Sequence, residues 1–174
     1  MNTRYTRNSI IIIVLLFFAV VVFAIVRQPQ SDGQDIIGYL ESTVVTAQAH
    51  SQWIDDYKTL TGRYGELSQT EKVAQLNQLL DRMEVIQADV DQSTPPGVLE
   101  RVKSKWNNEC ELVLQAVYYI VLGFENNKPE WSAEAYEFLL EADELRQEWT
   151  DELAELMEKN AIAAPDFVYK AYFT

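Results

Sequence analysis

The chain has 174 residues, of which 48% are hydrophobic and 24% charged, so its composition suits a folded domain with a real core rather than a disordered segment. Its formal net charge is −13, and because three of the 14 basic residues (Arg4, Arg7 and Arg27) precede every acidic one, residues 28–174 keep 11 basic residues against 27 acidic, a net charge of −16. That charge excludes a nucleic-acid-binding role, which needs clustered Lys and Arg. A basic protein partner or divalent cations stay compatible with it.

Residues 9–27 predict a transmembrane anchor. Ile10 to Val26 are 17 consecutive apolar residues, about the minimum needed to cross a hydrocarbon core of ~30 Å at 1.5 Å per residue. Arg4 and Arg7 lie before the run, which favours a cytoplasmic N-terminus (1–8) and a C-terminal part outside the cytoplasm. We therefore expect a single-pass cell-membrane protein.

A cleaved signal peptide is the alternative to this signal-anchor. Val22 and Ala24 stand at the −3 and −1 positions for cleavage after Ala24. The apolar run is longer than the ~7–15 residues usual for a signal peptide, which favours the anchor.

Residues 28–34, a polar stretch, predict a short linker that reaches at most about 25 Å when extended. Residues 35–60 then show an amphipathic helical pattern. Its apolar or small positions alternate three and four apart: Ile37, Leu40, Val44, Ala47, Ser51 and Ile54. Trp53, Tyr57 and Leu60 widen this apolar stripe.

Three further helices follow. Ser68 and Glu71 form a capping-box pattern that opens the second. Thr94 is a natural N-cap for a third helix, whose second half, 112–124, is apolar on nearly every side but too short to span a membrane. Pro129 or Ser132 begins the fourth. Four helices with short loops predict an all-α, antiparallel up-down-up-down four-helix bundle over 35–160.

Neither the single histidine nor the single cysteine is predicted to form a catalytic or metal site. His50, the only histidine, lies on the flank of the first helix's apolar stripe with no carboxylate within a turn on its face. Cys110, the only cysteine, is expected either to be buried or to bridge two chains outside the cell. We predict no catalytic, cofactor-binding or metal-ligating residue, and no cofactor.

The fourth helix is strongly acidic. Eleven acidic residues lie between Glu130 and Glu158, against Arg146 alone within that span. At this density we expect a solvated outer face. Weak binding of divalent cations is a less favoured alternative, and a catalytic carboxylate pair is the least favoured.

The C-terminal tail, 161–174, is rich in aromatic residues. In the predicted topology it returns to the end of the bundle nearest the membrane. Aromatic residues and a Lys suit the headgroup layer. One hypothesis is that the tail contacts the membrane, and the other is that it folds back over the bundle. The candidate contacts are Phe167, Tyr169, Lys170, Tyr172 and Phe173.

These features predict a membrane-anchored, non-catalytic binding or scaffold module with a protein partner on the bundle surface. A small-ligand sensor is the alternative, and it would need a membrane partner to pass on its signal. A metal-dependent enzyme is the least favoured function, because the chain has too few His and Cys ligands for the common sites.

Overall fold

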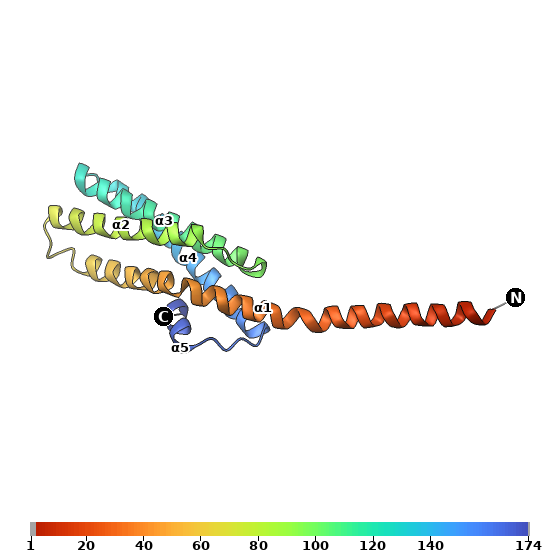
Figure 1. The fold of residues 1–174 in the computed structure, drawn as a ribbon. Coiled ribbons are helices and arrows are strands. Elements are labelled where there is room, and N and C mark those ends of the chain that lie inside the picture. Colours follow the sequence, from red (N-terminus) through yellow and green to blue (C-terminus); the bar gives the residue numbers. More distant parts are fainter. Residues whose placement is uncertain (1–2, 174) are drawn as a thin grey trace.

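The helices fill most of the chain (Figure 1). The computed structural model describes the backbone of residues 3–173 and the side chains of residues 33–173. Within that part of the chain the fold is a helical bundle without strands, which confirms the all-α prediction. The elements are α1 (Thr3–Gly62), α2 (Gln69–Gln92), the 3₁₀ helix η1 (Gly97–Leu99), α3 (Glu100–Asn126), α4 (Glu130–Lys159) and α5 (Asp166–Phe173).

Helix α1 runs unbroken through residues 28–34, so the predicted linker is helical rather than extended. Pro29 and Gly33 disfavour a helix interior, so the three glutamines among these seven residues, although good helix formers, do not account for the helix alone. Extending an existing helix costs far less than nucleating a second one. Figure 1 shows the N-terminal part of α1 projecting well beyond the other helices.

Among the residues with described side chains, no helix is long and apolar enough to cross a membrane. The predicted anchor at 9–27 and the alternative cleavage point at Ala24 lie outside those residues. Both therefore stay predictions.

The start of α2 confirms the capping box. The backbone N–H of Glu71 donates to Ser68 Oγ at 3.3 Å, and that of Ser68 donates to Glu71 Oε2 at 2.8 Å. These two bonds satisfy donors that the first helical turn leaves unpaired.

The N-cap predicted at Thr94 is wrong. Helical structure begins only at Gly97, and α3 itself at Glu100. The reason is the pair Pro95-Pro96, because a residue that precedes a proline is pushed away from helical dihedrals. Thr94 and Pro95 both precede a proline, so helical dihedrals are disfavoured at both, and Pro96 is the extended N-cap of η1.

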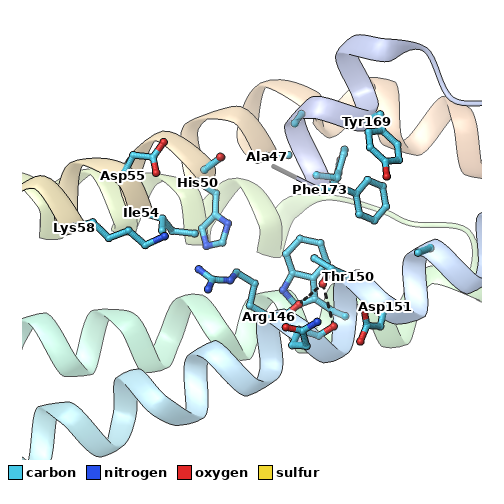
Figure 2. A pocket seen from close by; sticks show the side chains of 16 residues that line it. Ala47, His50, Ile54, Asp55, Lys58, Arg146, Thr150, Asp151, Tyr169 and Phe173 are labelled. Carbon is cyan, nitrogen blue, oxygen red and sulfur yellow. Dashed lines mark hydrogen bonds between the residues drawn. The ribbon is translucent and has the colours of Figure 1, made fainter.

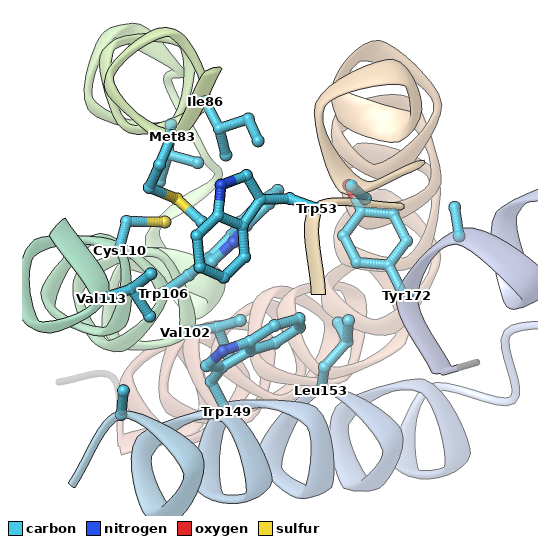
Figure 3. Packing of buried hydrophobic residues seen from close by; sticks show 14 of the residues in the cluster. Trp53, Met83, Ile86, Val102, Trp106, Cys110, Val113, Trp149, Leu153 and Tyr172 are labelled. Carbon is cyan, nitrogen blue, oxygen red and sulfur yellow. The ribbon is translucent and has the colours of Figure 1, made fainter. Parts of the chain in front are cut away.

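The second half of α3 forms core, as predicted for 112–124, with Val113, Ala116, Val117, Ile120 and Val121 all buried. Toward the other end of the bundle the core is aromatic. Figure 3 shows Trp106 of α3 surrounded by Trp53, Trp149 and Tyr172, which come from three other helices.

The buried face of α1 follows the prediction at Leu40, Ala47, Trp53 and Leu60, all of which are buried. It differs by one residue elsewhere: Ile36, Thr43 and His50 are buried, where the pattern predicted Ile37, Val44 and Ser51, which are half-buried. Apolar periodicity treats Thr and His as surface residues. Here both have polar partners inside the bundle, which makes their burial tolerable.

Helix α5 replaces part of the expected α1–α4 contact. Helix α3 packs along α4 and α2, whereas α1 packs on α2 and α5. The chain after α4 returns to the start of the bundle part of α1, where a Cβ on Gly33 would lie 3.8 Å from Ile162 Cγ1. The tail thus folds back along α1 and leaves α1 and α4 separated by a cleft.

Candidate functional site

The cleft between α1 and α4 has a volume of about 450 Å³ (Figure 2). His50 and Ile54 line it from α1, Trp149 lines it from α4, and α5 closes one end with Tyr169 and Phe173. A cavity of this size lies within the range of small-ligand pockets, which is ~300–1,000 Å³.

A buried polar cluster joins three helices at the floor of this cleft. Trp149 Nε1 on α4 donates a 2.7 Å hydrogen bond to Glu109 Oε2 on α3. The other carboxylate oxygen, Oε1, lies 3.2 Å from Nε2 of His50 on α1, a close contact whose angle is poor for a hydrogen bond. Exposed fractions are 2% for Glu109, 3% for Trp149 and 4% for His50. A carboxylate this deeply buried needs these partners, since an unpaired charge in the core is costly.

Aromatic rings hold the cluster in place. The rings of Trp106 and Trp149 stack at 5.5 Å, and the edge of His50 meets Trp106 at 6.1 Å. Tyr172 of α5 packs against Trp106 at 5.9 Å, and its hydroxyl is hydrogen-bonded to that of Thr43 on α1. Each of these ring pairs adds attraction beyond the area it buries, so together they stabilise the floor of the cleft.

Charged side chains surround the opening. Lys58 of α1 and Arg146 of α4 line the cleft, and so do Asp55 and Asp151. In Figure 2, Lys58 and Arg146 extend into the cleft from opposite walls, at the end away from α5. The cleft therefore offers hydrogen-bond donors and positive charge at one end and aromatic rings at the other.

A histidine beside a buried carboxylate can act as a general base if a substrate proton comes within hydrogen-bond reach. Glu109 does not line the cleft itself; it lies behind His50 and Trp149. The arrangement thus presents imidazole, indole and cationic groups to a bound molecule, while the carboxylate keeps them oriented.

The candidate membrane contacts in the tail divide into two groups. Tyr172 is 6% exposed and belongs to the core, so its side chain does not face a membrane. This position agrees with the hypothesis that the tail folds back over the bundle. Phe167 and Tyr169 are about half exposed, Lys170 is exposed, and Phe173 is half-buried. Contact of these four residues with a membrane stays a prediction.

The acidic face of α4 is partly paired. Lys105 of α3 lies 2.9 Å from Glu148 Oε2 and 3.0 Å from Glu152 Oε2, and Arg101 lies 3.4 Å from Glu152. Hydrogen bonds from Lys105 to Glu148, and second to Glu152, raise the pKa of Lys105. Within residues 33–173, no group of three or more His, Cys, Asp or Glu side chains is arranged to hold a metal ion. Weak cation binding along the rest of the face stays a prediction.

Cys110 is completely buried, which settles the two alternatives for its thiol in favour of the core. Burial, and then the nearby charge of Glu109, raises the pKa of this thiol. A disulfide to a second chain would require the bundle to open.

Glu109 is the residue that sequence reasoning missed. It lies on the buried face of α3, three residues after Trp106 and four before Val113. A Glu on the apolar face of a helix indicates a buried polar partner, because Glu is almost never fully buried without one. This was the signal in the sequence that could have identified Glu109. The statement that His50 has no carboxylate on its own helix face holds, but its partner comes from another helix.

No family model, no curated protein and no solved structure matches this chain.

Proposed function

We propose that this protein is a membrane-tethered, non-catalytic binding module whose ligand occupies the cleft between α1 and α4. The observation that carries the proposal is the cleft itself: about 450 Å³, walled by three helices and floored by His50 and Trp149. Binding pockets typically combine apolar walls with a few fixed polar groups, as this cleft does.

The architecture that goes with this function is one transmembrane helix at 9–27 and an antiparallel up-down-up-down bundle outside the cytoplasm. The basic N-terminus and the apolar run support the anchor and its orientation. The loops in Figure 1, which lie at alternate ends of successive helices, support the bundle topology. Because α1 is helical through 28–34, the anchor and the cleft share one continuous helix.

The positions of the polar groups favour binding over catalysis. Both oxygens of Glu109 face protein partners, Trp149 and His50, rather than the cleft. The buried cluster therefore serves to fix the walls of the site, and the groups left to meet a ligand are donors and rings.

A small-ligand sensor is the second candidate. What favours it is that α1 both lines the cleft and continues toward the predicted anchor. A ligand that changes the packing of α1 against α4 and α5 would then bias the orientation of the membrane helix, which a membrane partner could detect.

Native mass spectrometry of the full chain, purified in nanodiscs, tests the binding role. We expect a small molecule to be retained by the wild type and lost in Ala154→Trp, because Ala154 is an exposed residue of the cleft wall and an indole there fills the space. Ala133→Trp, at an exposed position of α4 outside the cleft lining, is the matched control. A molecule retained equally by all three proteins would place binding elsewhere.

A further inference from the structure

We infer that the cleft binds an organic monocarboxylate with an apolar or aromatic body, an inference that rests on the proposed binding role of the cleft. It follows from where the charged groups and the aromatic rings lie along the cleft.

One end of the cleft is cationic. Lys58 and Arg146 come from different helices and enter the same cleft (Figure 2), in a chain whose net charge is −13. Within residues 33–173, Lys58 has no ion-pair partner. Arg146 pairs with Asp143, which is 67% exposed, and solvent-exposed pairs of this kind are weak. Its guanidinium can therefore exchange that partner for a carboxylate, which arginine binds with two parallel hydrogen bonds.

The other end of the cleft is apolar. The rings of Tyr169 and Phe173 lie 4.9 Å apart on α5, beside Ala47 at the same end of the cleft. From Ala47 to Lys58 the cleft follows eleven residues of α1, about 16 Å at 1.5 Å per residue along the backbone. The Lys58 side chain extends into the cleft (Figure 2), so the distance between the cationic head groups and the rings is shorter than that backbone span. A ligand that meets both ends thus needs a body of several carbon atoms between its acid group and its ring.

The charged residues of the cleft also limit how many negative charges a ligand can carry. The charged side chains of the lining balance, since Lys58 and Arg146 are cationic and Asp55 and Asp151 are anionic. Asp55 lies three residues before Lys58 on the same wall, so it opposes a dianion such as phosphate more strongly than a carboxylate. Asp151 lies on the α4 wall toward α5, where it would repel a second carboxylate. A monocarboxylate satisfies both conditions.

The test compares probes that differ only in their head group, titrated into the full chain in phosphatidylcholine nanodiscs. The probes are phenylbutyrate, phenylbutyramide and phenylbutylammonium, with acetate as the acid without a body. Tryptophan fluorescence is the readout, because Trp149 lines the cleft. We expect phenylbutyrate to bind at least about tenfold more tightly than each of the others, which corresponds to ~1.4 kcal/mol.

Arg146→Gln and Lys58→Gln should each remove most of this preference. Arg101→Gln, at a 75% exposed position of α3 outside the cleft lining, is the matched control and should keep it. The inference is overturned if phenylbutyrate does not bind, if the amide binds equally well, or if the preference survives in both cleft variants. Equal binding of acid and amide that Ala154→Trp abolishes would leave the binding role standing and remove only the ligand class.

Discussion

Trp149 on α4 donates its indole N–H to Glu109 on α3 at 2.7 Å, and both side chains are almost fully buried. The bond joins the two helices that pack most extensively in this bundle and places a carboxylate directly behind the floor of the cleft. Stability and site geometry therefore depend on the same contact.

Glu109→Ala should destabilise the bundle by about 3–5 kcal/mol, because it leaves Trp149 Nε1 without an acceptor and opens a cavity beside His50. Chemical denaturation of the full chain in detergent, followed by tryptophan fluorescence, measures the change. Glu111→Ala, at an exposed position of the same helix, is the control and should change stability by less than ~0.5 kcal/mol. Equal effects of the two substitutions would show that the buried carboxylate has no structural role.

Trp149→Phe keeps a ring against Trp106 but removes the N–H that Glu109 accepts. A buried acceptor left unpaired costs about 1–3 kcal/mol, so we expect a loss of that size in the free energy of unfolding. Trp131→Phe serves as the control, since the indole of Trp131 is only half-buried at the start of α4. The hydrogen bond would be unimportant if both variants lost the same small amount.

Cys110 should resist thiol reagents in the folded protein. It is fully buried and its pKa is raised by burial, so the reactive thiolate is scarce at pH 8. Labelling by iodoacetamide should be far slower in native conditions than in concentrated urea. Non-reducing electrophoresis should likewise show no Cys110-linked dimer before unfolding. Labelling at the rate of a free thiol in the native protein would contradict this packing.

The tail should lie above the headgroup layer rather than in it. Thr43, which bonds Tyr172, is 16 residues beyond Arg27, or about 24 Å along a continuous α1. A fluorophore on Tyr169→Cys should therefore not be quenched by spin-labelled lipids in nanodiscs. The same fluorophore on Gln28→Cys, next to the predicted anchor, is the positive control. Equal quenching at both sites would instead support the membrane-contact hypothesis for the tail.

Asp56 and Arg82 form a pH-dependent link between α1 and α2. Arg82 donates to Asp56 at 2.6 Å and, together with Gln52, lowers the pKa of that carboxyl. A lowered folded-state pKa means that the stabilisation is complete above the usual Asp pKa and is lost as pH falls through the lowered value. The pair is about 40% exposed, so its coupling should be only ~0.5 kcal/mol. A double-mutant cycle with Asp56→Asn and Arg82→Gln should show this coupling at pH 7 and none near pH 2. Coupling that persists in acid would rule out an ionic origin.

The sequence predicts the helical elements well because their signals are local. The capping box at Ser68 and the apolar second half of α3 each depend on residues a few positions apart. The Thr94 error is also local, since it overlooked how one proline constrains the residue before it.

The candidate site could not be predicted in the same way, because its contacts join residues far apart in the chain. Glu109 meets His50 and Trp149, which lie 59 and 40 positions away. Apolar periodicity also missed the burial of Thr43 and His50 on α1, since it cannot anticipate that these two side chains meet polar groups inside the bundle. The helix at Asp166–Phe173 was missed because its eight residues bury one side only against helices formed much earlier in the chain.

Saturation-transfer NMR with a library of small fragments, on the full chain in nanodiscs, tests the binding role of the cleft most directly, since it requires no knowledge of the ligand. The account predicts that fragments bind the wild type and Ala133→Trp but lose their signal with Ala154→Trp, which fills the cleft. Fragments that bind all three proteins equally, or a library that yields no binder to the wild type, would contradict it.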